Sequence, residues 1–516
     1  MDDGMHVSVS AHLGCVMDRR MDCRLLGAMA GRRRGRWNAV WSGYKMATNS
    51  RCWIEGLVSV WQQQQQLDLP QDPPIQPFLE SLLFILSLFQ EASAMLFTPL
   101  IAVAAAGLAA IGQVAAKPTP KPKPGPSDDL KPFKQIELGP RPYYLVDDMN
   151  DGPLKAKLDS CKELRMRPSS FSIAHRGGAP LQFPEHSRES NLAGARMGAG
   201  ILECDVAFTK DLELVCRHSQ CDLHTTTNVV DVPELNAKCA QPFMPAAGGK
   251  PASAKCCTSD LTLAEFKSLC SKMDAFNASA TTPADYLGGV LPWRTDLYNT
   301  CGTPLSLEEH IAMTEALGLQ FTPELKTPEV PMPFQGHYTQ QQYSQQFIDA
   351  FKRAGIPASR VYVQSFLYDD ILYWLRHEPD FARQAMFLDS VADLFGMDAA
   401  VANLTQYKKD GVRYVAPPLP YLVTARDGKI VPSEYAETAK KLGLKMFTWS
   451  LERSGPIAEV HALGDYFYGS IQDVVKRDGD IYTLVDVLAR QVGVAGMFSD
   501  WSATVTYYAN CFGLGL

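Results

Sequence analysis

The sequence predicts an α/β protein whose core is a (β/α)8 TIM barrel with a Cys-rich insertion after the second strand. Short apolar runs recur from residue 171 onward, helical patterns separate them, and the gap between the second and third runs is over twice the usual unit length. A doubly wound open sheet is the alternative for the same pattern. The runs cover residues 171–174, 201–206, 319–325, 361–364, 384–388, 412–415, 444–449 and 494–499.

Composition limits the class of protein before any motif is considered. The chain has 516 residues, of which 46% are hydrophobic and 20% are charged, so it has ample apolar material for a large core. Its formal net charge is -7. Nucleic-acid binders depend on a basic face that neutralises phosphates, and so we expect no nucleic-acid partner.

The first 134 residues differ from the rest. Residues 1–94 lack sustained periodicity and contain a basic run and a glutamine run, so we expect either disorder or an upstream artefact of the gene model. Residues 95–116 combine a short apolar core with small residues at the end, which predicts a signal peptide, and the Pro/Lys tract at 117–134 predicts an extended linker. If Met1 is the true start, residues 78–116 are instead a candidate signal anchor.

Both interpretations carry the remaining domain, residues 135–516, across a membrane. With the signal peptide removed, the mature protein is expected to be secreted or bound to the cell wall, without a stable membrane span. Asn277 and Asn403 lie in glycosylation acceptor motifs, which agrees with export but is common by chance.

The cysteines point in the same direction. Ten of the 13 follow residue 160, and no paired C-x-x-C spacing suggests zinc, so disulfides are expected. Six of them, from Cys221 to Cys301, fall in the long gap between the second and third strands. We therefore predict a disulfide-linked insertion at about 219–302, whose pairing the sequence leaves open.

Acidic side chains occupy alternate positions on two of the predicted strands. Side chains alternate along a strand, so Glu203 and Asp205 share one face, as do Glu324 and Lys326. In a barrel that face points inward, near the carboxyl ends of the strands where TIM-barrel enzymes build their sites. We therefore expect these four side chains to converge at one mouth.

Two histidines and an arginine are expected beside them. His175 ends the first run and precedes Arg176, while His218 ends the segment 212–218, which the turn-like residues 209–211 fold back against the second strand. Alone, each of these residues is more often a satisfied polar group than a functional one. The functional prediction therefore rests on the joint pattern.

A divalent cation accounts for the clustered acids. Carboxylates in an apolar barrel interior are costly unless a positive charge compensates them. Ca²⁺ or Mg²⁺, which prefer oxygen ligands, would provide that charge, and the choice between the two stays open. Such a site is suited to an anionic small-molecule substrate.

Four segments of the chain also carry a family resemblance: IAHRGGAPLQFPEHSRESNLAGARMGAGILECDVAFTKDLELVCRH, TPELK, FTWSLE and GMFSDW. Together they resemble the glycerophosphodiester phosphodiesterase family, in particular its long secreted or periplasmic type, over about residues 171–505. The resemblance implies a TIM barrel with an insertion after the second strand. It also implies metal-dependent hydrolysis of glycerophosphodiesters to sn-glycerol 3-phosphate and an alcohol, a reaction of lipid and glycerol metabolism.

Matching the motifs residue by residue implies roles for eight side chains. They are His175 and His218 as general acid and base, Glu203, Asp205 and Glu324 as metal ligands, Arg176 and Lys326 as phosphate contacts, and Trp449 as an aromatic lining of the substrate cleft.

This chain departs from the family pattern at two places. Ser219 stands where the family usually has Asp after the second histidine, which puts the tuning of His218 in doubt. The closing motif is Ser499-Asp500-Trp501-Ser where the family has Thr-Asp-Phe/Tyr-Pro, and we expect this change to reshape the rim without affecting the chemistry.

The charges suggest a mechanism in which the metal, Arg176 and Lys326 neutralise the phosphate while one histidine activates the nucleophile and the other protonates the leaving alkoxide. The nucleophile is either water or the neighbouring glycerol hydroxyl. Three rival functions remain: a phospholipase D-like barrel enzyme of the sphingomyelinase D or lysophospholipase D kind, a catalytically inactive secreted phosphate-binding protein, and a polysaccharide-active barrel.

Overall fold

A computed structural model of the protein describes residues 30–33, 36–39, 130–298 and 301–516. The chain divides into two units, Met1–Thr119 and Pro120–Leu516. In the first unit, β1 (Ala30–Arg33) pairs antiparallel with β2 (Arg36–Ala39). The predicted signal peptide, and most of the segments predicted as disordered or linker, lie outside the described residues. Within the described part of the chain, no helix has the length and apolar character needed to cross a membrane.

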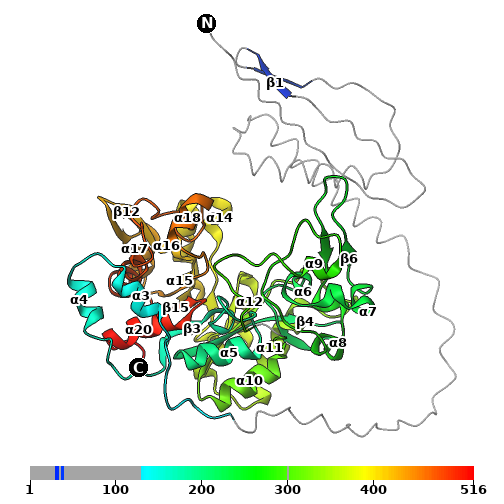
Figure 1. Ribbon diagram of the computed structural model, residues 1–516, viewed down its shortest axis with the longest axis horizontal. Coiled ribbons are helices and arrows are strands. Elements are labelled where there is room, and N and C mark those ends of the chain that lie inside the picture. Colours follow the sequence, from blue (N-terminus) through cyan, green and yellow to red (C-terminus); the bar gives the residue numbers. More distant parts are fainter. Residues whose placement is uncertain (1–29, 34–35, 40–129, 299–300) are drawn as a thin grey trace, which may run out of the picture. The chain divides into compact units, whose positions relative to one another are not determined.

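The second unit is built on a closed barrel of eight parallel strands (Figure 1). Each strand pairs with the next one around the barrel, and β15 pairs with β3 and β3 with β4, so that the sheet closes on itself. The strands are β3 (Ser169–Ala174), β4 (Ala199–Phe208), β8 (Gln320–Leu325), β9 (Gln364–Ser365), β10 (Met386–Phe387), β11 (Tyr414–Val415), β14 (Lys445–Leu451) and β15 (Gly496–Ser499).

Every barrel strand overlaps one of the eight apolar runs, so the predicted TIM barrel is confirmed and the open doubly wound sheet is wrong. The barrel interior is apolar below the mouth, because Ile173, Ile201, Met386, Tyr414 and Phe447 belong to one buried cluster. This layer supports the polar side chains above it.

Helices follow the strands and cover the outside of the barrel. Several begin where capping predicts: Ser306 and Glu309 form a capping box at the start of α10, and Thr339 and Gln342 form one at the start of α11. The main helices are α5 (Arg188–Arg196), α10 (Leu307–Ala316), α11 (Gln340–Arg353), α12 (Tyr368–His377), α13 (Pro379–Ala382), α15 (Met397–Asp410), α17 (Glu434–Lys441), α19 (Asp480–Asp486) and α20 (Ser502–Phe512).

Shorter elements lie in the loops that follow the later strands. They are α14 (Val391–Phe395) after β10, α16 (Leu419–Leu422) and the hairpin β12 (Val423–Arg426) and β13 (Lys429–Pro432) after β11, and α18 (Ile457–Leu463) after β14. Because these loops leave the carboxyl ends of their strands, they belong to the mouth side of the barrel.

The predicted insertion is present between β4 and β8. It begins with β5 (Leu214–Cys216), which pairs antiparallel with β4 as the predicted turn requires. Three disulfides join Cys221 to Cys257, Cys239 to Cys256 and Cys270 to Cys301. The remaining elements are α6 (Leu223–Thr226), α7 (Pro233–Asn236), β6 (Gln241–Met244), β7 (Ser253–Lys255), α8 (Leu263–Lys267) and α9 (Pro283–Tyr286).

The segment before the barrel packs on its last helix. It forms α3 (Arg141–Asp147) and α4 (Pro153–Asp159), and in Figure 1 these helices and α20 lie at the opposite end of the unit from the insertion. A disulfide joins Cys161 to Cys511, so the first and last parts of the domain are covalently linked.

Candidate active site

The eight side chains selected from the sequence line a single pocket at the mouth of the barrel. The His-Arg-Gly-Gly segment directly follows β3 at this mouth, and its residues Arg176, Gly177 and Gly178 all have positive φ. A Cβ atom on Gly177 would lie 2.5 Å from Ser190 Oγ, so only glycine fits between β3 and α5. The lining residues are His175, Arg176, Glu203, Asp205, His218, Glu324, Lys326, Gln364, Phe366, Leu388, Trp449, Ser450, Arg453, Phe467 and Phe498.

Glu203, Asp205 and Glu324 come together as the alternation along β4 and β8 predicts. All three are buried, and one carboxylate oxygen from each lies within 4.8 Å of the others. Two oxygens bound to one Ca²⁺ ion at about 2.4 Å lie no more than about 4.8 Å apart, so the spacing fits a shared divalent cation. Asp205 Oδ1 is buried without a hydrogen-bond partner among the described residues, which leaves it available to such an ion.

Burial opposes ionisation of all three acids. Burial and the neighbouring Asp205 raise the pKa of Glu324 to about 8, although Lys326 opposes the shift. Burial and Asp205 also raise the pKa of Glu203 well above its usual range. Burial alone would raise the pKa of Asp205 too, but His186 and Lys326 lower it. The chemistry of this donor set therefore fits a cation that displaces protons on binding.

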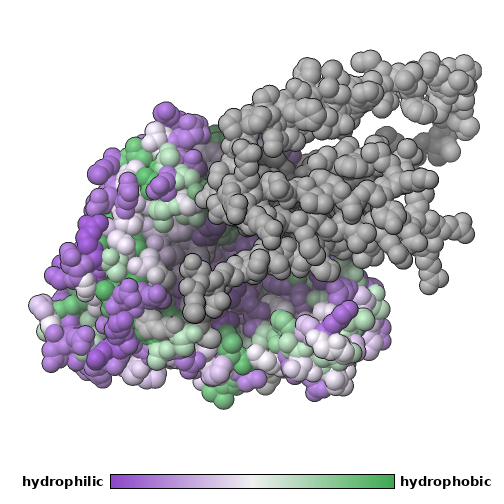
Figure 2. All heavy atoms as spheres, turned by 90° about the horizontal axis from the view of Figure 1, so that it is seen from above, coloured by the Kyte–Doolittle hydropathy of each residue, from purple (hydrophilic) through white to green (hydrophobic). Residues whose placement is uncertain are grey.

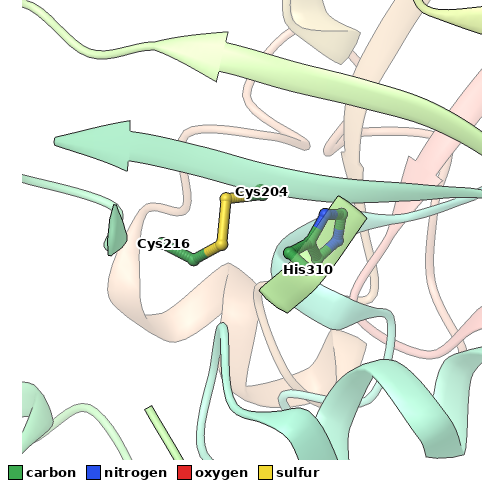
Figure 3. Close-up of side chains that lie close together, drawn as sticks. All are labelled: Cys204, Cys216 and His310. Carbon is green, nitrogen blue, oxygen red and sulfur yellow. A yellow bond between two sulfur atoms is a disulfide. The ribbon is translucent and has the colours of Figure 1, made fainter. Parts of the chain in front are cut away.

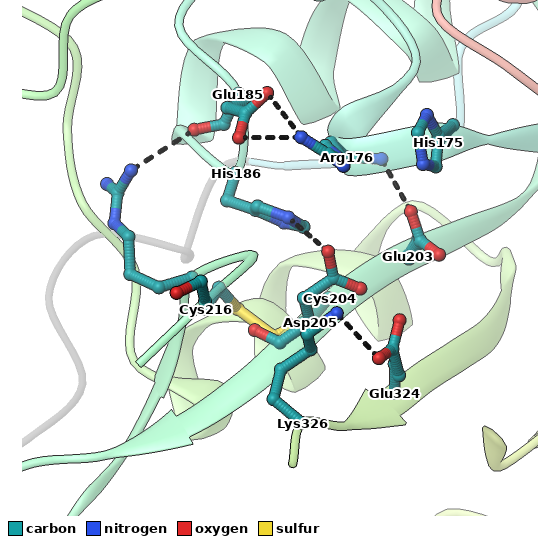
Figure 4. Close-up of polar contacts among 12 residues, drawn as sticks. His175, Arg176, Glu185, His186, Glu203, Cys204, Asp205, Cys216, Glu324 and Lys326 are labelled. Atoms are coloured by element: carbon teal, nitrogen blue, oxygen red, sulfur yellow. Dashed lines mark hydrogen bonds and ion pairs between the residues drawn. A yellow bond between two sulfur atoms is a disulfide. The ribbon is translucent and has the colours of Figure 1, made fainter. Parts of the chain in front are cut away.

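Glu185 and His186 of the Pro-Glu-His-Ser motif each bond to a residue that lines the pocket (Figure 4). Glu185 accepts hydrogen bonds from Arg176 Nη1 at 3.0 and 3.1 Å, and His186 Nε2 lies 2.9 Å from Asp205 Oδ2. The backbone N–H of Arg176 donates to Glu203 at 2.6 Å. The loop after β3 therefore holds the Arg176 side chain within the loop and the Glu203 and Asp205 side chains on β4.

His175 is paired with a carboxylate of the closing motif that was not among the predicted site residues. Its Nδ1 lies 2.5 Å from Asp500 Oδ1, at the end of β15. Asp500 is fully buried, and its other oxygen accepts from Arg453 at 3.1 Å and from Arg294 at 3.4 Å. This contact orients the His175 ring and directs Nε2 to the pocket. Asp500 is the motif residue that this chain keeps, so the expectation that the changes at Ser499, Trp501 and Ser502 only reshape the rim stays a prediction.

The two arginines and His175 keep Asp500 ionised. Burial would raise the pKa of Asp500, but Arg453 and His175 lower it below its usual range. For His175, burial lowers the pKa to about 4 and outweighs the opposing effect of Asp500. A neutral imidazole can accept a proton, and a neighbouring carboxylate stabilises the positive charge that forms.

His218 lies near two carboxylates, although Ser219 does not supply one. One ring nitrogen of His218 and one oxygen each from Glu185 and Asp222 lie within 4.8 Å of one another. Ser219 instead turns away, and its hydroxyl donates to Glu329. Burial raises the pKa of Asp222 to about 7, and burial together with Arg176 and Lys326 lowers the pKa of His218 well below its usual value.

The predicted phosphate contacts are already ion-paired. Arg176 pairs with Glu185, and Lys326 Nζ lies 2.6 Å from Glu324 Oε1. Arg453, which was not among the predicted site residues, lines the same pocket and contacts Glu185 at 3.3 Å. No local motif marks Arg453, since its partners lie far away in the sequence.

The far wall of the pocket is aromatic. The rings of Phe366 and Phe467 lie edge-on to Trp449, with centroids at 5.8 and 6.1 Å. Trp449 Nε1 donates to the carbonyl of Ala416 at 2.8 Å, so this side chain presents its apolar faces. The pocket therefore has a charged half and an apolar half.

A disulfide lies directly behind the acids. Cys204 stands between Glu203 and Asp205 on β4, points to the opposite face, and bonds to Cys216 on β5 (Figure 3). His310 lies beside the disulfide in the same view. Because both sulfur atoms are in the S–S bond, this cluster is not a metal site in the structure. Instead the bond joins the strand of the acids to the strand that leads to His218.

Comparisons with known proteins agree with this geometry. The sequence model described as "Glycerophosphoryl diester phosphodiesterase family" matches residues 175–504. A relative from Arthroderma benhamiae, named "Extracellular protein", is 55% identical over 245 residues, which are 47% of this chain and all of that protein.

Solved structures resemble this chain at low identity. A putative glycerophosphoryl diester phosphodiesterase from Silicibacter pomeroyi is 17% identical with a TM-score of 0.43, covering 70% of this chain and 99% of that one. A phosphodiesterase from Oleispira antarctica, in complex with the product sn-glycerol-3-phosphate, is 15% identical with a TM-score of 0.39, covering 66% and 96%.

Proposed function

This chain belongs to the glycerophosphoryl diester phosphodiesterase family and is an enzyme of that kind, and we propose that it hydrolyses glycerophosphodiesters to sn-glycerol 3-phosphate and an alcohol with a divalent metal and two histidines. The observation that carries this proposal is one pocket lined by His175, His218 and the three clustered acids. One pocket at the mouth of the barrel then contains both a cation site and two histidines that can transfer protons.

In the proposed site, Glu203, Asp205 and Glu324 hold Ca²⁺ or Mg²⁺. When bound, the ion neutralises charge on the phosphate oxygens and lowers the barrier to attack at phosphorus. Arg176, whose Nε is buried without a partner among the described residues, contacts the phosphate from the other side. Lys326, which is paired with Glu324 here, would be free to contact the phosphate if a bound ion neutralised Glu324.

The histidines carry the protons of the hydrolysis. A water oxygen forms the new bond to phosphorus, the bond from phosphorus to the alcohol oxygen breaks, one histidine takes the proton of the water, and the other gives a proton to the alcohol. Asp500 holds His175 in the tautomer whose Nε2 faces the pocket. Asp222 supports His218 in place of the carboxylate that Ser219 lacks.

We also propose that the protein acts outside the cell after cleavage near Ala116. Support comes from the name of the Arthroderma relative and from five disulfides among the described residues. Asn403 is exposed on α15 and can accept a glycan. N-terminal sequencing of the exported protein should begin near Lys117, and any peptide from residues 1–94 would contradict this proposal.

The test of the activity is direct. Purified protein, stripped with a chelator, is incubated with glycerophosphocholine, and sn-glycerol 3-phosphate and choline are quantified before and after adding Ca²⁺ or Mg²⁺. We expect product only with metal. Equal rates with and without metal would remove the ion from the mechanism, and phosphocholine with glycerol as products would place the cleaved bond on the other side of the phosphate.

A further inference from the structure

A charged residue is the buried anchor of an otherwise exposed segment of the insertion. Residues 291–298, which we call the strap, leave Leu291, Leu297 and Tyr298 43%, 70% and 52% exposed, whereas Arg294 is 7% exposed and is the only buried residue of the strap. On the coloured surface in Figure 2, apolar residues also lie in small groups among hydrophilic ones, so exposed apolar side chains are ordinary in this protein. The buried arginine is the unusual feature.

The strap lies against two loops at the mouth of the barrel. The backbone N–H of Thr295 donates to the carbonyl of Leu181, in the loop after β3, at 2.9 Å. A Cβ atom on Gly455, in the loop after β14, would lie 2.5 Å from ring atoms of Trp293, so this ring packs directly on the backbone there. These contacts on either side place Arg294 at the mouth.

Arg294 contacts the carboxylate that orients His175. Its Nη2 donates to Asp500 Oδ2 at 3.4 Å, and the same oxygen accepts from Arg453 at 3.1 Å, while Asp500 Oδ1 lies 2.5 Å from His175 Nδ1. Arg453 also pairs with two other carboxylates. Asp500 is the one carboxylate with which Arg294 forms an ion pair in the described part of the chain.

This placement of Arg294 opposes stability unless its charge is used. Burial and the nearby Arg453 lower the pKa of Arg294 from its usual value, and Arg294 Nε is buried without a partner among the described residues. An apolar side chain could anchor the strap without losing hydrogen bonds to water. Asp500 Oδ2 already accepts from Arg453, so a second arginine is not needed to satisfy that oxygen. What Arg294 adds is a second positive charge, which favours the ionised form of Asp500.

We propose that Arg294 is a positioning residue for the hydrolysis, acting on His175 through Asp500, so that the insertion supplies part of the active site. The inference rests on the proposed function, because it requires His175 to transfer a proton. Arg294 is not among the residues that line the pocket, so it acts through its neighbour and not by touching the substrate. Its loss should therefore change kcat and leave KM nearly unchanged.

The first test replaces Arg294 by Gln and measures turnover of glycerophosphocholine with Ca²⁺ or Mg²⁺ present. We expect kcat to fall by about 10–100-fold while KM stays within about threefold, because only the support of His175 is weakened. Arg294→Lys keeps the charge and should retain kcat within about fivefold of the wild type. Lys267→Gln is the matched control, since Lys267 is a cation of the same insertion that pairs with Glu309, and its kcat should stay within about twofold. An unchanged kcat in Arg294→Gln would overturn the proposal.

A double-mutant cycle with Asp500→Asn decides whether Arg294 acts through that carboxylate. In the Asp500→Asn background, the further loss caused by Arg294→Gln should be below about threefold. Losses that multiply in full would show that Arg294 acts by another route, and the proposal would be wrong. Arg294→Met, which has no charge, is carried through the same cycle, so that a folding defect of the Gln variant, detected by its melting curve, does not decide the result.

The pH profile gives a readout that a purely structural role would not change. The charged groups nearest to His175 are Asp500, Arg176 and Arg453. Without Arg294, Asp500 is less neutralised, so the pKa of His175 should rise and the limb of the kcat profile that belongs to His175 should move to higher pH. An unmoved limb with a lowered Tm would make Arg294 a structural anchor only. Absence of turnover by the wild type with metal would instead contradict the proposed function.

Discussion

His175 Nδ1 lies 2.5 Å from Asp500 Oδ1, although the two residues are 325 positions apart in the chain. They meet because β3 and β15 are neighbours in the closed barrel. The contact gives His175, one of the two proposed catalytic histidines, a buried, ionised partner, and the first prediction follows from it.

Replacing Asp500 by Asn should lower kcat by about 10²–10⁴-fold, because the amide no longer holds His175 in the tautomer with a free Nε2. Steady-state kinetics on glycerophosphocholine would measure this loss, and metal binding should persist. Asp389→Asn is the matched control, since Asp389 is equally buried at the end of β10 but bonds to Tyr435. A similar loss of kcat in both variants would contradict the role of Asp500.

Substitution of either histidine should separate the acid from the base. His175→Ala and His218→Ala should each lose about 10²–10⁴-fold in rate and one limb of the bell-shaped pH profile. A diester with a nitrophenolate leaving group needs little protonation, so it should rescue only the variant that lacks the acid. His224→Ala, in the insertion, serves as the control, and equal rescue of both histidine variants would refute the division of roles.

Substitution of Asp222 should lower kcat more than substitution of Ser219. Replacing Asp222 by Asn is expected to lower kcat by about 10–100-fold with little change in KM, because His218 loses one of its two neighbouring carboxylates. Ser219→Ala removes only a hydroxyl that donates to Glu329, so its kcat should stay within about threefold. If the Ser219 variant shows the larger loss, His218 depends on the neighbouring hydroxyl instead.

Stability of the metal-free protein should fall as pH rises from about 5 to about 8. The pKa of Glu324 is raised from 4.5 to about 8, so the folded state binds a proton in this range that the unfolded state has released. Unfolding is therefore favoured increasingly as the pH passes through this window. Calorimetry in a chelator would measure the fall in Tm.

Adding Ca²⁺ or Mg²⁺ should restore the Tm, with a larger effect at pH 8 than at pH 5, because the ion competes with the proton. Glu324→Gln is the control, since an amide does not titrate and the dependence on pH should flatten. A metal-free Tm that rises between pH 5 and pH 8 would show that the acids are already compensated.

The barrel and seven of the predicted pocket residues could be predicted from local sequence patterns, whereas Trp449 was selected through the family resemblance. Apolar runs mark strands, and the carboxyl ends of parallel strands meet at one mouth. Glu203 and Glu324 therefore converge independently of the conformation of the loops. Asp500, Arg453 and Arg294 were not selected because their contacts join segments that are distant in the chain. Cysteine pairing was likewise open, since six cysteines in the insertion allow 15 connectivities.

The bond between Cys204 and Cys216 has a consequence for how the protein is produced. It lies on the outer face of the strand whose inner face carries the acids, and it closes a short loop before His218. In a reducing cytosol the barrel strands can still pair, but the hairpin that leads to His218 loses its covalent attachment. Recombinant enzyme made in an oxidising compartment is therefore expected to have a higher specific activity than equally soluble enzyme made in the cytosol.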